Sequence, residues 1–287
     1  GVARRTDPVP VPLAPYISLE GVTSIACSNK HVLLLTCMGT VYSMGHNAEG
    51  ALGVGDVNPR GAFSLVPFPD AKTGSDGAPP KINRIAAGSG AIGSHSCAVS
   101  STGDLYVWGA AYICGLGTSK PVLEPTLLPI SSAPDPDQDN LDPEDVERIL
   151  EEAEAKEEED GGARSARAAA ASEKILDVGC GAGFTVAVLQ GGRVASWGIW
   201  AHGVLGLGMV PKSANTSNRA RKRMARFQMK PSLILGLKNI SMVACGEAHT
   251  LCVSDRGYLL AWGRNSAGQL GTGVTERAAC YWTTTVP

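Results

Sequence analysis

The chain has 287 residues, with 35 glycines, 18 prolines and 8 cysteines, and its 25 basic and 27 acidic residues give a formal net charge of −2. Only 5% of the residues are aromatic and 18% are charged, a composition that favours many short strands joined by tight turns over a helical bundle. No apolar run approaches the roughly 18 residues that a membrane helix needs, so we expect no membrane insertion.

One pattern occurs four times along the chain, in segments that start at Ile25, Ser94, Asp177 and Met242. Each segment contains an anchor that ends in glycine: Met44-Gly45, Trp108-Gly109, Trp197-Gly198 and Trp262-Gly263. Successive anchors are 64, 89 and 65 residues apart. Thirteen residues before the anchors lie His31, His95, Phe184 and His249. This agreement in spacing indicates an internal structural repeat.

The fourth repeat predicts the local structure of all of them. Apolar and polar residues alternate from His249 to Ser254, "SDRG" supplies turn residues, and "YLLAW" continues as an apolar strand, which is typical of a β-hairpin. A glycine-rich stretch follows, in which we expect one leucine per repeat to enter the core: Leu52, Leu116, Leu205 and Leu270. A single small sheet cannot bury both of its faces, so the repeats are predicted to stack as the blades of an all-β propeller.

The segment "CGEAHTLCVSDRGYLLAWGRNSAGQLGTG" resembles the repeat of the regulator of chromosome condensation family, whose members form seven-bladed β-propellers. The second repeat departs from the pattern, because it has extra residues in "GSGAIGSHS" and Cys114 where the others have a glycine. Seven blades of roughly 60 residues would need about 400 residues. We therefore expect about four blades of a longer propeller, with a small four-bladed ring as the alternative.

The repeats divide the chain into three parts. Residues 1–130 are predicted to hold the first two blades, and residues 131–174 form an insertion of different composition. Residues 175–287 are predicted to hold the third and fourth blades and the start of a further one.

The insertion is strongly acidic. From Asp135 to Asp160 there are fourteen acidic residues against Arg148 and Lys156. Asp142-Pro143 is a typical helix start, and it predicts a helix over about 143–158. Its apolar face contains Val146, Ile149 and Leu150, which we expect to dock on a partner. The alternative is a solvated acidic loop without a fixed fold.

A basic segment lies in the third repeat. Its six cationic residues are Arg219, Arg221, Lys222, Arg223, Arg226 and Lys230. Outside residues 135–160 the chain has 23 basic and 13 acidic residues, so a basic body carries an acidic arm. Clustered Lys and Arg favour contact with RNA or an acidic protein, where Phe227 is a candidate for base stacking. The alternative is an exposed loop that the acidic arm neutralises.

The stretch "ILDVGCGAGFTVAVL" resembles the glycine-rich loop of methyltransferases that use S-adenosylmethionine. That loop needs a helix after it and a carboxylate for the ribose hydroxyls. Here Gly191-Gly192 interrupts the helix, and no Asp or Glu occurs between Asp177 and Glu247. We therefore expect no cofactor, and we assign the glycines to the repeat.

No catalytic or metal-binding pattern stands out among the remaining residues. Three of the eight cysteines, Cys27, Cys180 and Cys245, share one repeat position, and no Cys-x-x-Cys pair is present. We expect buried thiols and a reducing compartment, the cytoplasm or nucleus, with the mitochondrial matrix as the alternative. The recurring histidines and tryptophans are expected to pack or to hydrogen-bond within the blades.

These observations predict a non-enzymatic scaffold that binds other protein subunits of a larger assembly. The resemblance also implies an alternative function, guanine-nucleotide exchange on a Ran-type small GTPase.

Overall fold

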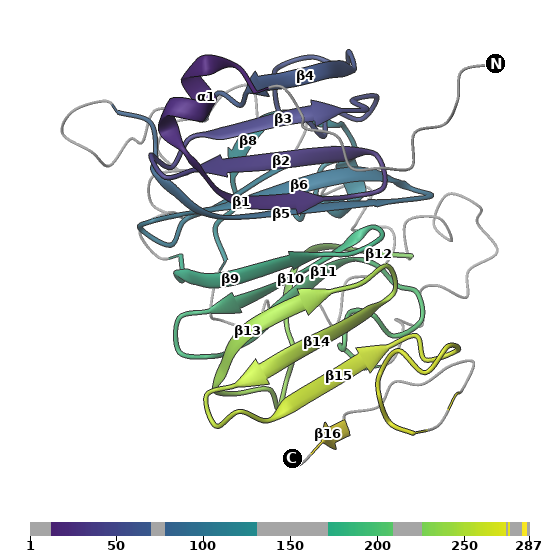
Figure 1. Cartoon of the computed structure of the whole chain (residues 1–287). Helices are drawn as coiled ribbons and strands as arrows, with labels where there is room; N and C mark the ends of the chain where they lie inside the picture. The colour runs from purple at the N-terminus through teal and green to yellow at the C-terminus, as the bar shows by residue number, and fades with distance from the viewer. Residues whose placement is uncertain are drawn as a thin grey trace, which may run out of the picture.

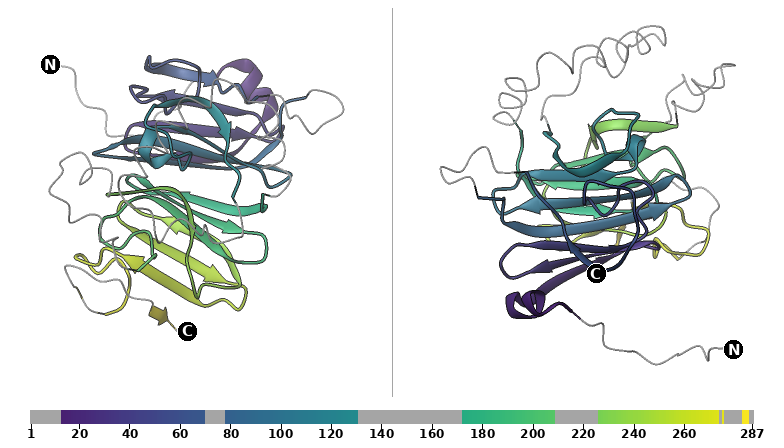
Figure 2. Two further views of the ribbon diagram at one scale, coloured as in Figure 1. Left: turned by 180° about the vertical axis from the view of Figure 1, so that it is seen from behind. Right: turned by 90° about the horizontal axis from the view of Figure 1, so that it is seen from above.

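The computed structural model describes residues 13–69, 78–130, 172–208, 226–273, 275 and 283–285. Within these residues the chain forms four antiparallel sheets of four strands each. Figure 1 shows the sheets following one another in chain order, and Figure 2 shows the same succession from behind and from above. We call these sheets blades 1 to 4. The all-β propeller prediction is confirmed, with four blades in the described part of the chain.

Each blade is built from four strands that are consecutive in the sequence. Blade 1 consists of β1 (Val22–Cys27), β2 (His31–Thr36), β3 (Val41–Gly45) and β4 (Arg60–Leu65). Blade 2 consists of β5 (Ile82–Gly90), β6 (Gly93–Ser100), β7 (Leu105–Gly109) and β8 (Val122–Leu127), with the short 3-10 helix η1 (Ala111–Ile113) after β7. Blade 3 consists of β9 (Ile175–Cys180), β10 (Phe184–Leu189), β11 (Val194–Ile199) and β12 (Phe227–Leu233). Blade 4 consists of β13 (Ile240–Cys245), β14 (His249–Ser254), β15 (Leu259–Gly263) and β16 (Thr283–Thr285).

The predicted hairpin is the second and third strand of every blade. The residue thirteen positions before each anchor pairs with the anchor glycine, in the pairs His31–Gly45, His95–Gly109, Phe184–Gly198 and His249–Gly263. These glycines have φ between 106° and 118°. A β-carbon on Gly45 would lie only 2.8 Å from the α-carbon of His31. The anchor glycine is therefore required both by its backbone conformation and by the close approach of the paired strand.

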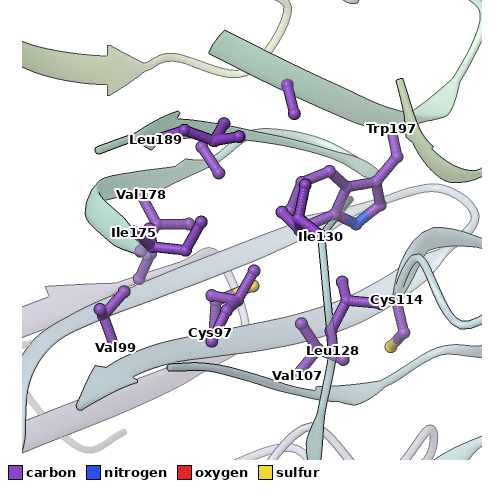
Figure 3. Close-up of a cluster of buried hydrophobic side chains, with 14 residues drawn as sticks. Cys97, Val99, Val107, Cys114, Leu128, Ile130, Ile175, Val178, Leu189 and Trp197 are labelled. Carbon is purple, nitrogen blue, oxygen red and sulfur yellow. The ribbon is translucent and has the colours of Figure 1, made fainter. Parts of the chain in front are cut away.

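The core lies between the blades, so the central strands are buried on both faces. All eight residues of β6 and all six of β10 are buried. Figure 3 shows the cluster between blades 2 and 3, where Cys97 and Val99 of β6 face Val178 of β9 and Trp197 of β11. Equivalent clusters join blade 1 to blade 2 and blade 3 to blade 4.

The outer face of blade 1 is covered by α1 (Pro15–Glu20). Ile17 of this helix is fully buried, and it packs on Leu34 and Tyr42 of the sheet. The helix thus covers apolar side chains on the face of blade 1 that points away from blade 2.

The acidic insertion leaves and re-enters the fold at one place. The amide of Ile130 donates to Oγ of Ser172 at 3.0 Å, and the amide of Glu173 donates to the carbonyl of Ile130 at 2.8 Å. The helix that we predict over 143–158 lies outside the described residues, so it remains a prediction.

The core leucine that we predict in the second repeat, Leu116, packs against the core but does not occupy the position shared by the other three. Leu52, Leu205 and Leu270 are buried as expected, but in blade 2 the buried residue at this position is Cys114, while Leu116 is only partly buried. The glycine after the core residue shows that Cys114 is equivalent to Leu52. A β-carbon on Gly53 would lie 2.7 Å from Nε1 of Trp108, and one on Gly115 would lie 2.7 Å from Nε1 of Trp197, in each case the anchor tryptophan of the next blade. The loop of blade 2 is two residues shorter than that of blade 1, so the sequence spacing placed its leucine incorrectly.

Candidate interaction surfaces

The recurring histidines connect neighbouring blades. Nε2 of His31 in blade 1 is hydrogen-bonded to Oγ of Ser96 in blade 2 at 2.8 Å. Nε2 of His95 in blade 2 is hydrogen-bonded to Oγ1 of Thr185 in blade 3 at 2.9 Å. All four side chains are buried. The histidine of one blade thus satisfies a hydroxyl group of the next, a structural use of the ring.

The third junction replaces this hydrogen bond by apolar packing. Phe184 of blade 3 occupies the histidine position and is fully buried among the residues between blades 3 and 4. Thr250 of blade 4, at the position of Ser96 and Thr185, is left with a long contact of 3.9 Å to Sγ of Cys245. At the histidine position, the junction between blades 3 and 4 therefore has apolar contacts in place of a hydrogen bond.

Burial lowers the pKa of two of the histidines. The pKa of His31 falls from 6.5 to about 4 because burial disfavours its charged form, and nearby His46 adds to the effect. Burial also lowers the pKa of His249. Both rings are thus held in the neutral form near pH 7, in which one ring nitrogen donates and the other accepts.

The three anchor tryptophans are buried residues of the core, as predicted. Nε1 of Trp108 donates to the carbonyl of Ala51 at 2.8 Å, and Nε1 of Trp262 donates to the carbonyl of Val204 at 2.8 Å. Each bond reaches back to the preceding blade. Nε1 of Trp197 is buried without a hydrogen-bond partner in the described part of the chain. The anchor therefore fixes blade spacing and is not available to a ligand.

The glycines of the methyltransferase-like stretch serve packing. A β-carbon on Gly179 would lie 2.9 Å from Sγ of Cys245, and one on Gly181 would lie 2.0 Å from the ring of Phe184. Gly183 has φ of 91° and lies against Ile92 of blade 2. The stretch forms β9, a turn and β10, where a cofactor loop would continue into a helix.

The aspartate of this stretch is also used between blades. Oδ2 of Asp177 accepts a hydrogen bond from the amide of Val243 in blade 4 at 2.9 Å. Its Oδ1 lies 3.8 Å from Nε of Arg84 in blade 2. Asp177 thus contacts both neighbouring blades.

The basic segment is only partly described. Arg226 and Lys230 are exposed, as a binding role requires, and the other four residues, Arg219, Arg221, Lys222 and Arg223, lie outside the described residues. Phe227 stacks on Tyr112 of blade 2 with ring centroids 5.3 Å apart, so one face of its ring is already covered. The three predicted docking residues of the acidic arm, Val146, Ile149 and Leu150, also lie outside the described residues.

The face of blade 4 that points away from blade 3 is partly exposed. It includes His249, Leu251 and Val253 of β14, which we call the outgoing face. The corresponding residues of β2, β6 and β10 are each at most 3% exposed, because the next blade covers them. No described side chain hydrogen-bonds the ring of His249. Sequence reasoning missed this surface because the three residues match buried positions of the repeat.

No group of three or more His, Cys, Asp or Glu side chains in the described residues is arranged to hold a metal ion. None of the helices in this part of the chain is long and apolar enough to cross a membrane.

Comparison with protein families identifies the repeat. Residues 22–51, 191–253 and 240–269 match models of the regulator of chromosome condensation (RCC1) repeat. The chain therefore contains repeats of the RCC1 family within residues 22–51 and 191–269. The matched segments lie in blades 1, 3 and 4, whereas blade 2 has a longer first hairpin and a shorter glycine-rich loop than these blades.

Curated relatives of the RCC1 repeat family differ in function. The chain is 29% identical over 263 residues to the ultraviolet-B receptor UVR8 of Arabidopsis thaliana, covering 90% of this chain and 45% of the relative. It is 29% identical over 273 residues to the human RCC1-like G exchanging factor-like protein, covering 93% of this chain and 46% of the relative. The chain thus spans less than half the length of either relative.

Solved structures show the same fold. Human WBSCR16 superposes with a TM-score of 0.60 at 23% identity, covering 93% of this chain and 54% of that one. Prp20p of Saccharomyces cerevisiae superposes with a TM-score of 0.61 at 21% identity, covering 93% of this chain and 50% of that one.

Proposed function

We propose that the chain is a non-enzymatic propeller scaffold for other protein subunits, and that its outgoing face on blade 4 packs against a further β-sheet. The observation that carries this proposal is the partial exposure of His249, Leu251 and Val253, whose counterparts are buried at every junction between described blades. An apolar sheet face of this kind is normally covered, as α1 covers blade 1.

The junctions between the described blades indicate which side chain should face the histidine of the outgoing face. Two of them place a Ser or Thr hydroxyl group opposite the histidine, and the third places apolar groups opposite Phe184. The outgoing face carries His249 at this position, so we propose that the sheet covering the face has a Ser or Thr opposite this histidine. A second copy of blade 1 fits poorly, because Val32 occupies that position and α1 packs on the same sheet.

The basic segment and the acidic arm are further candidate contacts. Arg226 and Lys230, the two described members of the basic segment, are exposed at and beside β12. We propose that this segment contacts RNA or an acidic protein. Replacing Arg221, Lys222 and Arg223 with Glu should weaken that contact and leave the unfolding temperature unchanged. Binding that survives this replacement would remove the segment from the account.

Variants of the outgoing face test the scaffold proposal. Leu251→Asp places a charge at the centre of the face and should separate it from the covering sheet, which is seen as loss of a subunit from the purified native complex or, where the sheet belongs to the same chain, as a lower unfolding temperature. Leu19→Asp, at an exposed position on α1, should change neither. Retention of every subunit together with an unchanged unfolding temperature in Leu251→Asp would contradict the proposal.

The alternative, guanine-nucleotide exchange on a Ran-type GTPase, is supported by the similarity to the human RCC1-like G exchanging factor-like protein. It is tested by release of a fluorescent nucleotide from such a GTPase. Release accelerated by the purified chain would establish the alternative, and release at the intrinsic rate would leave the scaffold proposal in place.

A further inference from the structure

Two thiols from different blades lie next to each other in the core. Sγ of Cys180, at the end of β9 in blade 3, is 3.6 Å from Sγ of Cys97 in β6 of blade 2. Cys97 is fully buried, as Figure 3 shows, and Cys180 is partly buried. Among the described cysteines this is the one recorded contact between two sulfur atoms.

The equivalent positions of the other junctions do not pair two thiols. Cys180 pairs with Thr185 on the neighbouring strand of blade 3. The residues that pair with the equivalent Ser96 and Thr250 are Ala87 in blade 2 and Cys245 in blade 4, so these two are the counterparts of Cys180. Between blades 1 and 2 the corresponding side chains are those of Leu33 and Ala87. Between blades 3 and 4 they are those of Val186 and Cys245. The thiol pair is thus a local feature of the junction between blades 2 and 3, beyond what the repeat requires.

We propose that Cys97 and Cys180 are an oxidation site at which a disulfide forms and links blades 2 and 3. In this reaction each thiol loses its proton and one electron, the two sulfur atoms bond, and a peroxide is reduced, so that hydrogen peroxide gives two molecules of water. The sulfur atoms must approach from 3.6 Å to a bond of about 2.05 Å, a movement of less than about 1 Å for each. Side-chain rotation supplies such a movement without separating the blades.

The surroundings of the pair set the rate of this reaction. Burial raises the pKa of Cys180 well above its usual range and outweighs the opposing effect of nearby His95. The sulfur atom of Cys180 is therefore held as a thiol near neutral pH, and only thiolates react readily with oxidants. We expect slow oxidation by mild peroxide, and a stable disulfide once it has formed.

The disulfide would also constrain the acidic insertion. Residues 131–171 lie between Cys97 and Cys180 in the sequence, and their two ends are joined by the hydrogen bonds of Ile130 to Ser172 and Glu173. A bond between the two cysteines closes a loop that contains this whole segment. Such a closure restricts the unfolded chain, so the oxidised protein should unfold at a higher urea concentration than the reduced protein.

The test is a peptide map of the full chain after oxidation. The protein is treated with hydrogen peroxide or with diamide, an azo compound that is reduced to a hydrazine, and free thiols are then blocked with N-ethylmaleimide. We expect a peptide pair linked through Cys97 and Cys180, lost again after dithiothreitol, while Cys245 is alkylated. A map in which Cys97 and Cys180 are both alkylated, or linked to other cysteines, would overturn the proposal.

Two variants provide matched controls. Cys180→Ser should abolish the linked pair and the shift in the urea midpoint, and Cys245→Ser, at the equivalent position of the next junction, should leave both unchanged. Loss of the shift in Cys245→Ser would assign it to another thiol and contradict the proposal. The map of the wild-type protein does not depend on either variant folding.

Discussion

The hydrogen bond between His95 and Thr185 offers a stringent test of how the blades are joined. The chain itself supplies the two replacements, because Phe184 occupies the histidine position in blade 3 and Val32 occupies the hydroxyl position in blade 1. His95→Phe and Thr185→Val are therefore substitutions that this fold already accommodates elsewhere.

The expected magnitudes follow from burial. Both side chains are 0% exposed, and their bond is 2.9 Å long. Each single variant leaves the other polar group buried without its partner, which should cost about 1–3 kcal/mol of unfolding free energy. The double variant removes both groups, so its cost should be similar to that of one single variant, giving a coupling free energy of about 1–3 kcal/mol.

The assay is equilibrium urea unfolding of the four proteins, followed by tryptophan fluorescence and by circular dichroism. Stabilities are compared through the midpoints when the slopes agree. If the two single costs add in the double variant to within about 0.5 kcal/mol, the bond does not couple the blades and the reasoning is refuted.

Three further predictions use other features of the blades. The free energy of unfolding should fall by about 3 kcal/mol as the pH is lowered from 6.5 to about 4, because His31 takes up a proton in the unfolded chain but not in the folded chain. His31→Gln should lose this pH dependence in urea unfolding, and a variant with the same pH profile as the wild type would contradict the prediction. Gly181→Ala should lower the free energy of unfolding by about 1–3 kcal/mol, because its β-carbon would collide with the ring of Phe184. Gly61→Ala is the control and should lower it by less than about 0.5 kcal/mol, because no atom lies within 4 Å of the added carbon. Equal unfolding temperatures of the two variants would argue against the packing role. Trp108→Phe should lower the free energy of unfolding by about 1 kcal/mol more than Trp197→Phe, because Nε1 of Trp108 donates a hydrogen bond and Nε1 of Trp197 has no partner among the described residues. Urea unfolding measures both, and the reversed order would be evidence against the anchor's role.

The hairpin of each blade could be predicted from the sequence because its determinants are local. The thirteen-residue spacing from His249 to Trp262 contains an alternating strand, a turn and a second strand, and it fixes the pairing of His249 with Gly263. The same spacing holds in all four repeats. Stacking of the blades then follows from the apolar character of both sheet faces.

The partners of the recurring side chains could not be predicted in this way. The hydrogen bond of His95 reaches Thr185, 90 residues later, on the far side of the acidic insertion. Finding it requires the order of the blades and the direction in which each strand faces. The exposure of Leu251 required the same information, because its sequence environment equals that of buried Leu33 and Val186.

The second repeat shows how a loop of different length defeats alignment by spacing. The turn through η1 brings Cys114 into the leucine position and Gly115 against Trp197. Counting from the anchor placed Leu116 there instead. The ring of Phe227 was likewise proposed for base stacking, but its contact with Tyr112 depends on the packing of β12 against blade 2.

Site-specific photo-crosslinking of the native complex tests the central claim most directly. A benzophenone amino acid is placed at Leu251 on the outgoing face or, as a control, at Leu19 on α1, and the crosslinked peptides are sequenced. The scaffold account predicts a protein adduct at position 251 whose crosslinked strand carries a Ser or Thr next to the attachment site, and none at position 19. Absence of any adduct at position 251 in the assembled complex would contradict the account.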